Sequence, residues 1–309
     1  MDLFNIPNDD GKTYRKKVFT SLLKNPELGY VDGATDYCLL IPFSEQFNLD
    51  LNQRVWLAFL YSVTYSQTTS MRFFKRFPNP EKIKKQELFD FWEENKDTLW
   101  FPSDRRHLKN NDQVIPAVVS FLKNSKRKPE EYIRTLDEFN KMYTTIKRDW
   151  LYYGPMGAYL FFDGLYGLAP ELYLDPDVLD WKNCCRGVVV EGMALFCYED
   201  ELLKTHDFPY DKYNRMVEKI QEKTGQPKII IESTLCAYRK FFKGTRYFGY
   251  YADRVLEECY FAEKYMPEDV DIWEYREKTI PNKFLGEKNG WKGIRKKNMS
   301  IWRKTGKLE

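Results

Sequence analysis

The sequence has few of the groups that most hydrolases and nucleotide-dependent enzymes use. Among 309 residues there are only two histidines, His107 and His206, and neither H-E-x-x-H nor G-x-S-x-G occurs. Zinc-protease and serine-hydrolase chemistry therefore lacks its usual base and nucleophile. The P-loop motif G-x-x-x-x-G-K-S/T and the G-x-G-x-x-G pattern are also absent. These absences exclude P-loop kinases and Rossmann dehydrogenases.

The six cysteines are scattered, and no C-x-x-C pair is present. This pattern predicts neither a disulfide framework nor a metal site. No apolar run approaches the roughly 18 residues that a membrane-spanning helix requires. The first residues, MDLFNIPNDDGKTYRKK, also lack the basic-then-apolar order of a secretory signal. We expect a soluble, intracellular protein that makes no contact with a membrane.

Net charge is only +3, because 49 Lys and Arg nearly balance 46 Asp and Glu. The chain is 43% hydrophobic and 17% aromatic, which is too much large apolar surface for a disordered protein. Residues 286–309 form a basic tail in which Trp291 and Trp302 alternate with Lys and Arg. Such a tail suits nucleic acid, because cations neutralise phosphates and indoles stack on bases. A solvated, frayed terminus explains the tail equally well.

Apolar residues recur every three or four positions in most long segments, which predicts a mainly α fold, a compact helical bundle. Residues 50–77, which are apolar on nearly all sides around Trp56 to Val63, predict a buried helix, which their Ser/Thr-rich middle could bend. Two later helices are predicted to stop at Gly225 and Gly244, because glycine readily adopts the left-handed conformation that ends a helix.

Residues 151–198 are rich in Gly, Pro and aromatic residues and predict a long irregular region. We therefore predict a single helical domain, 1–309, with lobes at approximately 1–150 and 151–285. The irregular region lies between the two lobes in this prediction.

The first group of candidate residues is Asp104-Arg105-Arg106-His107, which precedes the apolar run VIPAVVSFL. Arg105 and Arg106 could clamp an anion, because the guanidinium fork matches phosphate geometry. The nearby Asp112 has a simpler explanation as a cap of the following helix.

A second group contains Asp175, Asp177 and Asp180, followed by Asn183 and Arg186. Three buried carboxylates would be costly, so some must face solvent or meet cations. Asp180 or Asp177 could act as a general base or hold an ammonium group. An acidic turn with helix caps is the competing explanation.

A third group follows one helix face, because Glu232, Cys236, Arg239 or Lys240, and Lys243 are spaced by three or four residues. One carboxylate, one thiol and several cations favour anion binding, although a surface ladder of ion pairs would look the same. The segment continues with further candidates: Arg246, Tyr247, Asp253 and Arg254.

Three strings, DRRHLKNNDQVIPAVVSFL, GLAPELYLDPDVLDWKNCCRGVVVEGMAL and IESTLCAYRKFFKGTRYFGYYADRVLEE, resemble an all-helical family of bacteriophage thymine-hypermodification systems. Members are described as alpha-glutamyl/putrescinyl thymine pyrophosphorylases, or amino acid:DNA transferases. A related helical region occurs in phage 5-hydroxymethyluracil DNA kinases. The likeness extends over residues 50–265, and the missing P-loop favours the transferase branch.

The resemblance implies an enzyme that acts on double-stranded DNA whose 5-hydroxymethyluracil is already pyrophosphorylated. It would replace the pyrophosphate with the amine of an amino acid or polyamine, in the cytoplasm of an infected bacterial host. We expect no resident cofactor, although Mg²⁺ could accompany the pyrophosphate. Other phage modification enzymes are expected partners.

This reaction needs cations for the departing pyrophosphate, a carboxylate for the amine and aromatic rings for the base. The candidates for phosphate or substrate contacts are Arg105, Arg106, Asn183, Arg186, Arg239, Lys240, Arg246 and Arg254. For the amine, the candidates are Asp180, Glu232 and Asp253. Tyr247 could stack on an extruded base together with Tyr250 and Tyr251, although all three tyrosines could equally be core residues.

Two other functions agree with the same residues. A noncatalytic helical subunit that binds DNA for a separate enzyme would carry the same basic tail. A base-excising, glycosylase-like enzyme would also need an extruded base and a carboxylate, but no helix-hairpin-helix motif is present to favour it.

Overall fold

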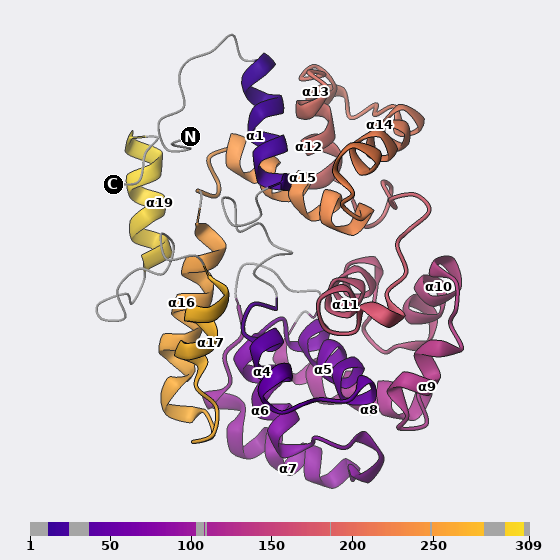
Figure 1. Cartoon of the computed structure of the whole chain (residues 1–309), viewed down its shortest axis with the longest axis vertical. Coiled ribbons are helices and arrows are strands. Elements are labelled where there is room, and N and C mark those ends of the chain that lie inside the picture. The colour runs from indigo at the N-terminus through magenta and orange to yellow at the C-terminus, as the bar shows by residue number, and fades with distance from the viewer. Residues whose placement is uncertain are drawn as a thin grey trace. The chain divides into compact units, whose positions relative to one another are not determined.

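A computed structural model of the chain describes residues 12–24, 37–102, 108, 110–185, 187–247, 249–280 and 294–305. Within these ranges every regular element is an α-helix or a short 3-10 helix, and no strand occurs (Figure 1). The prediction of a mainly α protein is confirmed. No helix in the described ranges is both long and apolar enough to cross a bilayer.

The helices form two compact units that alternate along the chain. Unit 1 comprises the described residues within 1–35, 175–257 and 280–309, and unit 2 those within 36–174 and 258–279. The chain passes from unit 2 to unit 1 between residues 174 and 175, whereas the sequence places a lobe boundary near residue 150.

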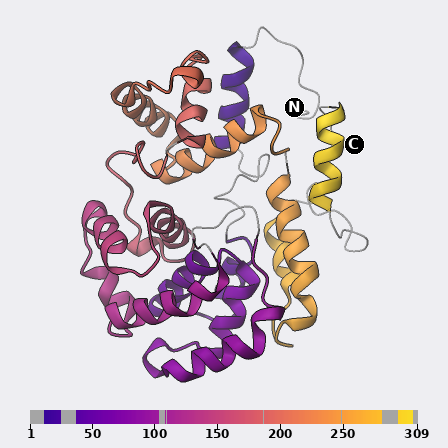
Figure 2. The same cartoon turned by 180° about the vertical axis from the view of Figure 1, so that it is seen from behind.

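Unit 1 holds helices from both ends of the chain. They are α1 (Lys12–Lys24), α12 (Val188–Phe196), α13 (Leu202–Thr205), α14 (Tyr210–Thr224), α15 (Lys228–Phe242), the first part of α16 (Tyr250–Ala262), and α19 (Ile294–Thr305). Figures 1 and 2 show α1, α12 and α14 gathered around α15.

Unit 2 contains a larger number of shorter elements. They are α4 (Leu40–Gln46), α5 (Leu51–Thr64), α6 (Gln67–Arg76), η1 (Pro80–Lys82), α7 (Lys85–Asn95), η2 (Lys96–Thr98), η3 (Asn111–Gln113), α8 (Val114–Asn124), α9 (Pro129–Arg134), α10 (Phe139–Asp149), α11 (Pro155–Leu168), η4 (Pro170–Leu172), the end of α16, η5 (Glu263–Tyr265) and α17 (Ile272–Thr279).

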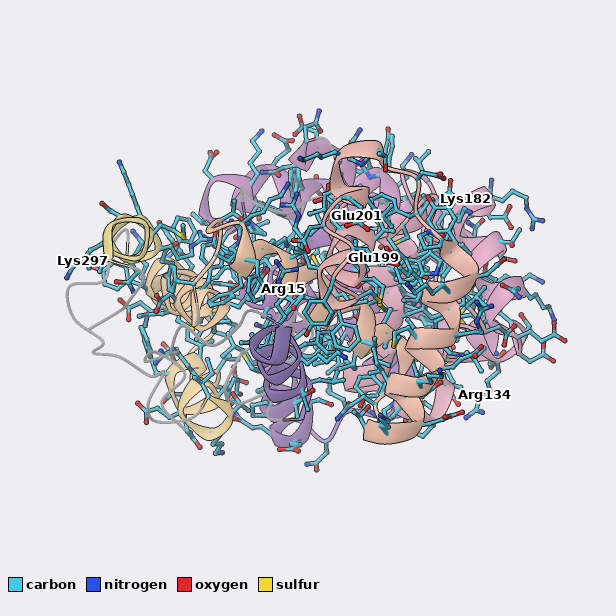
Figure 3. The ribbon with its side chains drawn as sticks, turned by 90° about the horizontal axis from the view of Figure 1, so that it is seen from above. Arg15, Arg134, Lys182, Glu199, Glu201 and Lys297 are labelled. Carbon is cyan, nitrogen blue, oxygen red and sulfur yellow. The ribbon has the colours of Figure 1, made fainter. Side chains whose placement is uncertain are left out.

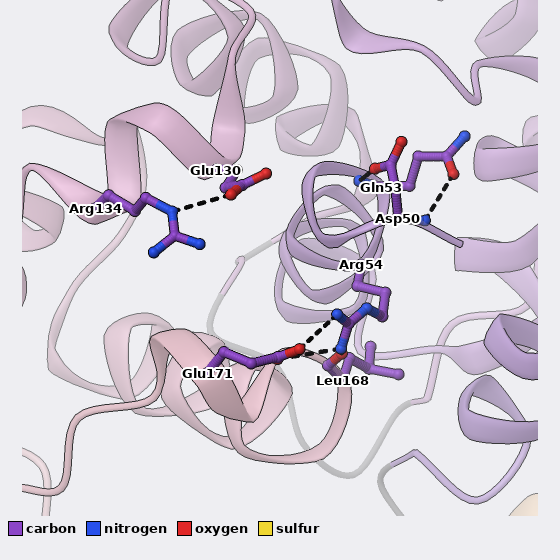
Figure 4. A network of polar contacts seen from close by, with 7 residues as sticks. All are labelled: Asp50, Gln53, Arg54, Glu130, Arg134, Leu168 and Glu171. Carbon is purple, nitrogen blue, oxygen red and sulfur yellow. Dashed lines mark hydrogen bonds and ion pairs between the residues drawn. The ribbon is translucent and has the colours of Figure 1, made fainter. Parts of the chain in front are cut away.

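Helix α5 is the centre of unit 2, and every residue from Val55 to Thr64 is buried. Asp50 and Gln53 close its N-terminus with a capping box (Figure 4). Arg54 ties it to the end of α11, donating to Glu171 at 2.6 and 3.1 Å and to the Leu168 carbonyl at 3.0 Å. From Val55 onward the helix is packed on all sides and has no exposed face, as the apolar sequence predicts.

The predicted helix over residues 50–77 is in fact two helices, because the chain breaks after Thr64. Tyr65 adopts a left-handed conformation with φ of 51°, and the Ser66 side chain caps α6 by accepting from Thr69 N. The buried Glu258 carboxylate binds this break, accepting from Ser66 Oγ at 2.8 Å and from Thr68 N at 2.7 Å. The Ser/Thr-rich middle therefore ends one helix and begins another.

The prediction of an irregular region over residues 151–198 is wrong, because α11 and α12 both lie inside it. Their glycines allow close helix packing. A Cβ on Gly167 would lie 2.4 Å from the Tyr37 ring, and a Cβ on Gly192 would lie 2.3 Å from the Leu235 carbonyl oxygen of α15. Glycine lowers helix propensity, but tertiary packing decides the structure here.

The core of unit 1 is built on α15, whose residues Ile231, Leu235 and Tyr238 are fully buried. Phe19 of α1 packs against Tyr238 with ring centroids 5.5 Å apart, and the Tyr238 hydroxyl donates to the Arg15 carbonyl at 3.2 Å. The predicted helix stops are confirmed, since Gly225 and Gly244 follow α14 and α15 with φ of 69° and 63°.

At one end of unit 1, ion pairs involve Arg15 of α1 and Glu199, which follows α12; Figure 3 labels both residues. Arg15 forms two hydrogen bonds to Asp200, at 2.6 and 2.8 Å. Glu199 accepts from the Tyr213 hydroxyl at 3.0 Å and pairs with Lys212. These contacts are half-exposed, so they contribute modestly to stability compared with the apolar core.

Candidate active site

Asp253 lies at the centre of a small polar network in unit 1. Its Oδ2 atom accepts from the Tyr247 hydroxyl at 2.5 Å and from Asn298 Nδ2 at 2.8 Å. Burial raises the pKa of Tyr247, and the Asp253 charge raises it further. The phenol therefore remains a protonated donor that holds the carboxylate in place.

Four cations surround two neighbouring tyrosine rings beside this network, and we call them the tyrosine-cation cluster. Tyr250 and Tyr251 have ring centroids 5.4 Å apart. The Arg246 guanidinium lies 4.1 Å from the Tyr250 centroid, a close cation-π distance. The other three cations are Lys240, Arg254 and Arg295.

Lys240 and Arg254 both approach Tyr251. Lys240 Nζ donates to the Tyr251 hydroxyl at 3.2 Å, and the Arg254 guanidinium lies 5.6 Å from the Tyr251 ring centroid. Arg254 is only 2% exposed, so its charge acts where water screens it little. Tyr247, Tyr250 and Tyr251 are 4%, 6% and 4% exposed, so the explanation of these tyrosines as core residues is confirmed. The cluster therefore concentrates positive charge against buried aromatic rings.

Helix α19 completes the cluster from the far end of the chain. Arg295 Nη1 donates to the Tyr250 hydroxyl at 3.2 Å, and Arg295 Nε donates to Glu257 at 2.6 Å. Together with Asn298, these contacts hold α19 on α16. Residues 294–305 of the predicted basic tail are thus a docked helix, while the remainder of 286–309 lies outside the described residues.

Arg239 has a carboxylate partner, Glu191 of α12. The guanidinium forms a hydrogen-bonded ion pair with Glu191, and Lys243 Nζ lies 3.4 Å from the same carboxylate. Both Glu191 and Arg239 are largely buried. This pair lies next to Gly192, where α12 packs closely on α15, so it joins the two helices.

Glu232 and Asp180 both lie near Cys185. Glu232 is 6% exposed. Burial and a hydrogen bond with Cys184 raise the pKa of the Cys185 thiol, and the charges of Glu232 and Asp180 raise it further. Cys185 is therefore an un-ionised thiol and a poor nucleophile.

Asp180 and Asn183 form a local turn. The Asp180 side chain accepts from Asn183 N at 3.2 Å and from Asn183 Nδ2 at 2.9 Å. Asp175 accepts from Lys228 N at 3.1 Å and so caps α15. The explanation of this segment as an acidic turn with caps accounts for both carboxylates.

The structure brings five of the predicted residues together: Lys240, Arg246, Tyr247, Asp253 and Arg254. Glu232 is eight residues before Lys240 on α15, which places it about 12 Å away along the helix axis. Arg105, Arg106 and Arg186 lie outside the described residues.

Sequence reasoning missed Glu191, Glu257, Arg295 and Asn298. Arg295 and Asn298 are 45 residues from their partners Tyr250 and Asp253. Nothing in the local pattern of either segment reveals this pairing. The basic character of the tail predicted that it binds an anion, but it did not predict that the tail contacts α16.

Unit 1 also contains a pocket of about 470 Å³ between α1, α14 and the end of α12. Its wall carries four lysines, namely Lys16, Lys212, Lys219 and Lys223. This charge favours an anionic ligand over a cationic one such as a polyamine. Among the described residues, no group of three or more His, Cys, Asp or Glu side chains is placed to hold a metal ion.

Cys197 lines the same pocket, and burial raises the pKa of its thiol to about 11. We expect iodoacetamide to label Cys197 slowly at pH 7.5, with a rate that rises about tenfold per pH unit up to pH 11, because only the thiolate reacts. Mass spectrometry of the modified peptide would measure this rate. A rate that levels off below pH 9 would contradict the burial argument.

Comparison with curated proteins finds a relative named Serinyltransferase from Salmonella phage ViI. It is 24% identical over 299 residues, with 83% of this chain and 71% of the relative covered. The chain is similar to a phage transferase. Because neither unit alone holds 83% of the residues, the similarity includes parts of both units.

No family model matches the chain. No solved structure matches it either.

Proposed function

We propose that this chain is an amino acid:DNA transferase. It would displace pyrophosphate from 5-pyrophosphoryloxymethyluracil in DNA with the amine of serine, another amino acid or a polyamine. The observation that carries the proposal is the tyrosine-cation cluster beside Asp253. The similarity to a phage serinyltransferase supports it independently.

The reaction breaks the C–O bond between the uracil 5-methylene and pyrophosphate, and it forms a C–N bond to the amine. Negative charge collects on the departing pyrophosphate, so fixed cations nearby lower the barrier. In this proposal Lys240, Arg246 and Arg295 receive the pyrophosphate. Guanidinium groups suit this role because their planar donors match phosphate oxygens.

The incoming amine must lose a proton to become a nucleophile and then lose another after attack. We assign Asp253 to this role, because it is the predicted carboxylate that lies beside the cations. Tyr247 and Asn298 hold it in position. Tyr250 and Tyr251 are only 6% and 4% exposed, so in this proposal their rings support the cations from the core.

The test is incubation of the purified chain with duplex DNA that contains 5-pyrophosphoryloxymethyluracil, with serine, other amino acids or polyamines added separately. We expect a new amine-bearing nucleoside by mass spectrometry and an equal amount of released pyrophosphate. Tight DNA binding without product would overturn the proposal in favour of a noncatalytic DNA-binding subunit. Free base and an abasic site would instead indicate a base-excising enzyme.

A further inference from the structure

The turn between α10 and α11 in unit 2 presents two large apolar side chains to solvent. Leu151 is 45% exposed and Tyr152 is 44% exposed. Their neighbours Trp150 and Tyr153 are buried in an aromatic core around Phe59. The turn is therefore fixed on both sides, and its two tip residues project from it.

Hydrogen bonds hold this turn in one conformation. Leu151 N donates to Ser120 Oγ at 3.1 Å, and Asn124 Nδ2 donates to the Asp149 carbonyl at 2.7 Å. Tyr152 adopts a left-handed conformation with φ of 67°, which is unfavourable for a residue with a large side chain. The surrounding contacts thus hold the backbone of an exposed residue in an unfavourable conformation, which is more typical of binding surfaces than of simple connections.

The exposed pair lies in a broad depression of about 690 Å³ that also contains Phe89, itself 36% exposed. Four cations line the depression against one carboxylate, Asp149. The cations are Lys85, Lys123, Lys147 and Arg148. Exposed apolar side chains inside a positively charged rim mark an interaction site rather than ordinary surface.

We propose that this surface binds duplex DNA and that Leu151 and Tyr152 insert between base pairs. The rim cations match the charge of the phosphate backbone. Apolar side chains on a rigid turn unstack bases, as the wedges of DNA-bending proteins do. The inference rests on the proposed function in taking DNA as the substrate, and it assigns to unit 2 the task of opening the duplex so that a base can leave the stack.

The insertion is tested with an unmodified duplex that carries 2-aminopurine, whose fluorescence rises when it is unstacked. The full chain is expected to raise the fluorescence on binding. The double variant Leu151→Ala/Tyr152→Asn is expected to lose this rise and to bind about tenfold more weakly. Asparagine is chosen because it tolerates the left-handed backbone of Tyr152. Tyr260→Ala, which removes a ring that is 41% exposed on α16, is the matched control and should change neither value.

The rim is tested by the salt dependence of the same binding. Lys123→Gln/Lys147→Gln is expected to reduce the slope of log affinity against log salt by about two, since each lysine releases about one counterion. Unchanged fluorescence and affinity in the Leu151/Tyr152 variant, or an unchanged slope in the lysine variant, would overturn the inference.

The two proposals fail separately in these experiments. If the full chain unstacks DNA through Leu151 and Tyr152 but forms no amine-bearing nucleoside, the transferase proposal fails and the DNA surface stands. If product forms while the double variant binds and unstacks DNA like the full chain, the DNA surface fails and the transferase proposal stands.

Discussion

Replacing Arg246 with alanine is expected to lower kcat for pyrophosphate release by about 10²–10³-fold, the usual cost of removing one group that stabilises developing negative charge. Arg246 stacks on Tyr250 at 4.1 Å and donates to the adjacent Thr245 carbonyl at 2.9 Å. Both contacts are local in the chain, so the variant should keep its fold. Single-turnover release of pyrophosphate from modified duplex DNA would give the rate directly.

The control for this variant is Lys297→Ala. Lys297 is an exposed cation on α19 that points away from the helix into solvent (Figure 3). Lys297→Ala should leave kcat unchanged. Arg246→Lys should retain part of the kcat that Arg246→Ala loses, because lysine supplies the charge without the planar guanidinium group. If Arg246→Ala weakens DNA binding but keeps kcat, Arg246 contacts the DNA backbone and has no part in leaving-group departure.

Substituting Gly192 with alanine is expected to lower the free energy of unfolding by about 3 kcal/mol, the upper range for overpacking a core. The added Cβ would lie 2.3 Å from the Leu235 carbonyl oxygen. A backbone atom within a helix cannot move aside, so α12 and α15 must separate. Denaturant unfolding followed by circular dichroism would measure the loss.

Gly154→Ala is the matched control, because nothing lies within 4 Å of a Cβ built on Gly154. Gly154 is the N-cap of α11, where alanine is slightly less favourable than glycine, so stability should fall by less than about 1 kcal/mol. Separation of α12 from α15 would also disturb the Glu191–Arg239 ion pair, and Arg239 directly precedes Lys240 of the tyrosine-cation cluster. Gly192→Ala should therefore lower activity at temperatures where the variant is still folded. Equal unfolding free energies for the two variants would refute the close packing of α12 on α15.

The part of the site that the sequence predicts consists of residues that lie close together along the chain. Lys240, Arg246, Tyr247, Asp253 and Arg254 fall within fifteen positions, on one helix end, one short connection and the next helix. A helical pattern over both segments is enough to bring such residues together. Helix stops are equally predictable, because Gly225 and Gly244 each adopt a conformation that glycine favours.

The remaining parts of the fold and the site depend on contacts between residues far apart in the sequence, which no local pattern predicts. Arg239 meets Glu191 across 48 positions, and Arg295 reaches Tyr250 across 45. The glycines of α11 and α12 look like helix breakers in the sequence, but Gly167 faces Tyr37 in the turn before α4, and Gly192 faces Leu235 of α15. Their effect is visible only when the packing partner is known.

The alternation of the two units along the chain has a consequence for biosynthesis. Helix α1 packs on α15, and Arg15 meets Tyr238 across 223 positions. At ribosomal speed that separation corresponds to a wait of roughly 10–45 s. During this time Val18, Phe19, Leu22 and Leu23, all buried in the folded protein, lack the cover of α15. Helix α12, whose Phe196 packs on Phe19 at 4.7 Å, becomes available only 42 residues before Tyr238. The nascent chain therefore depends on a chaperone or on transient burial of this face until α15 is made.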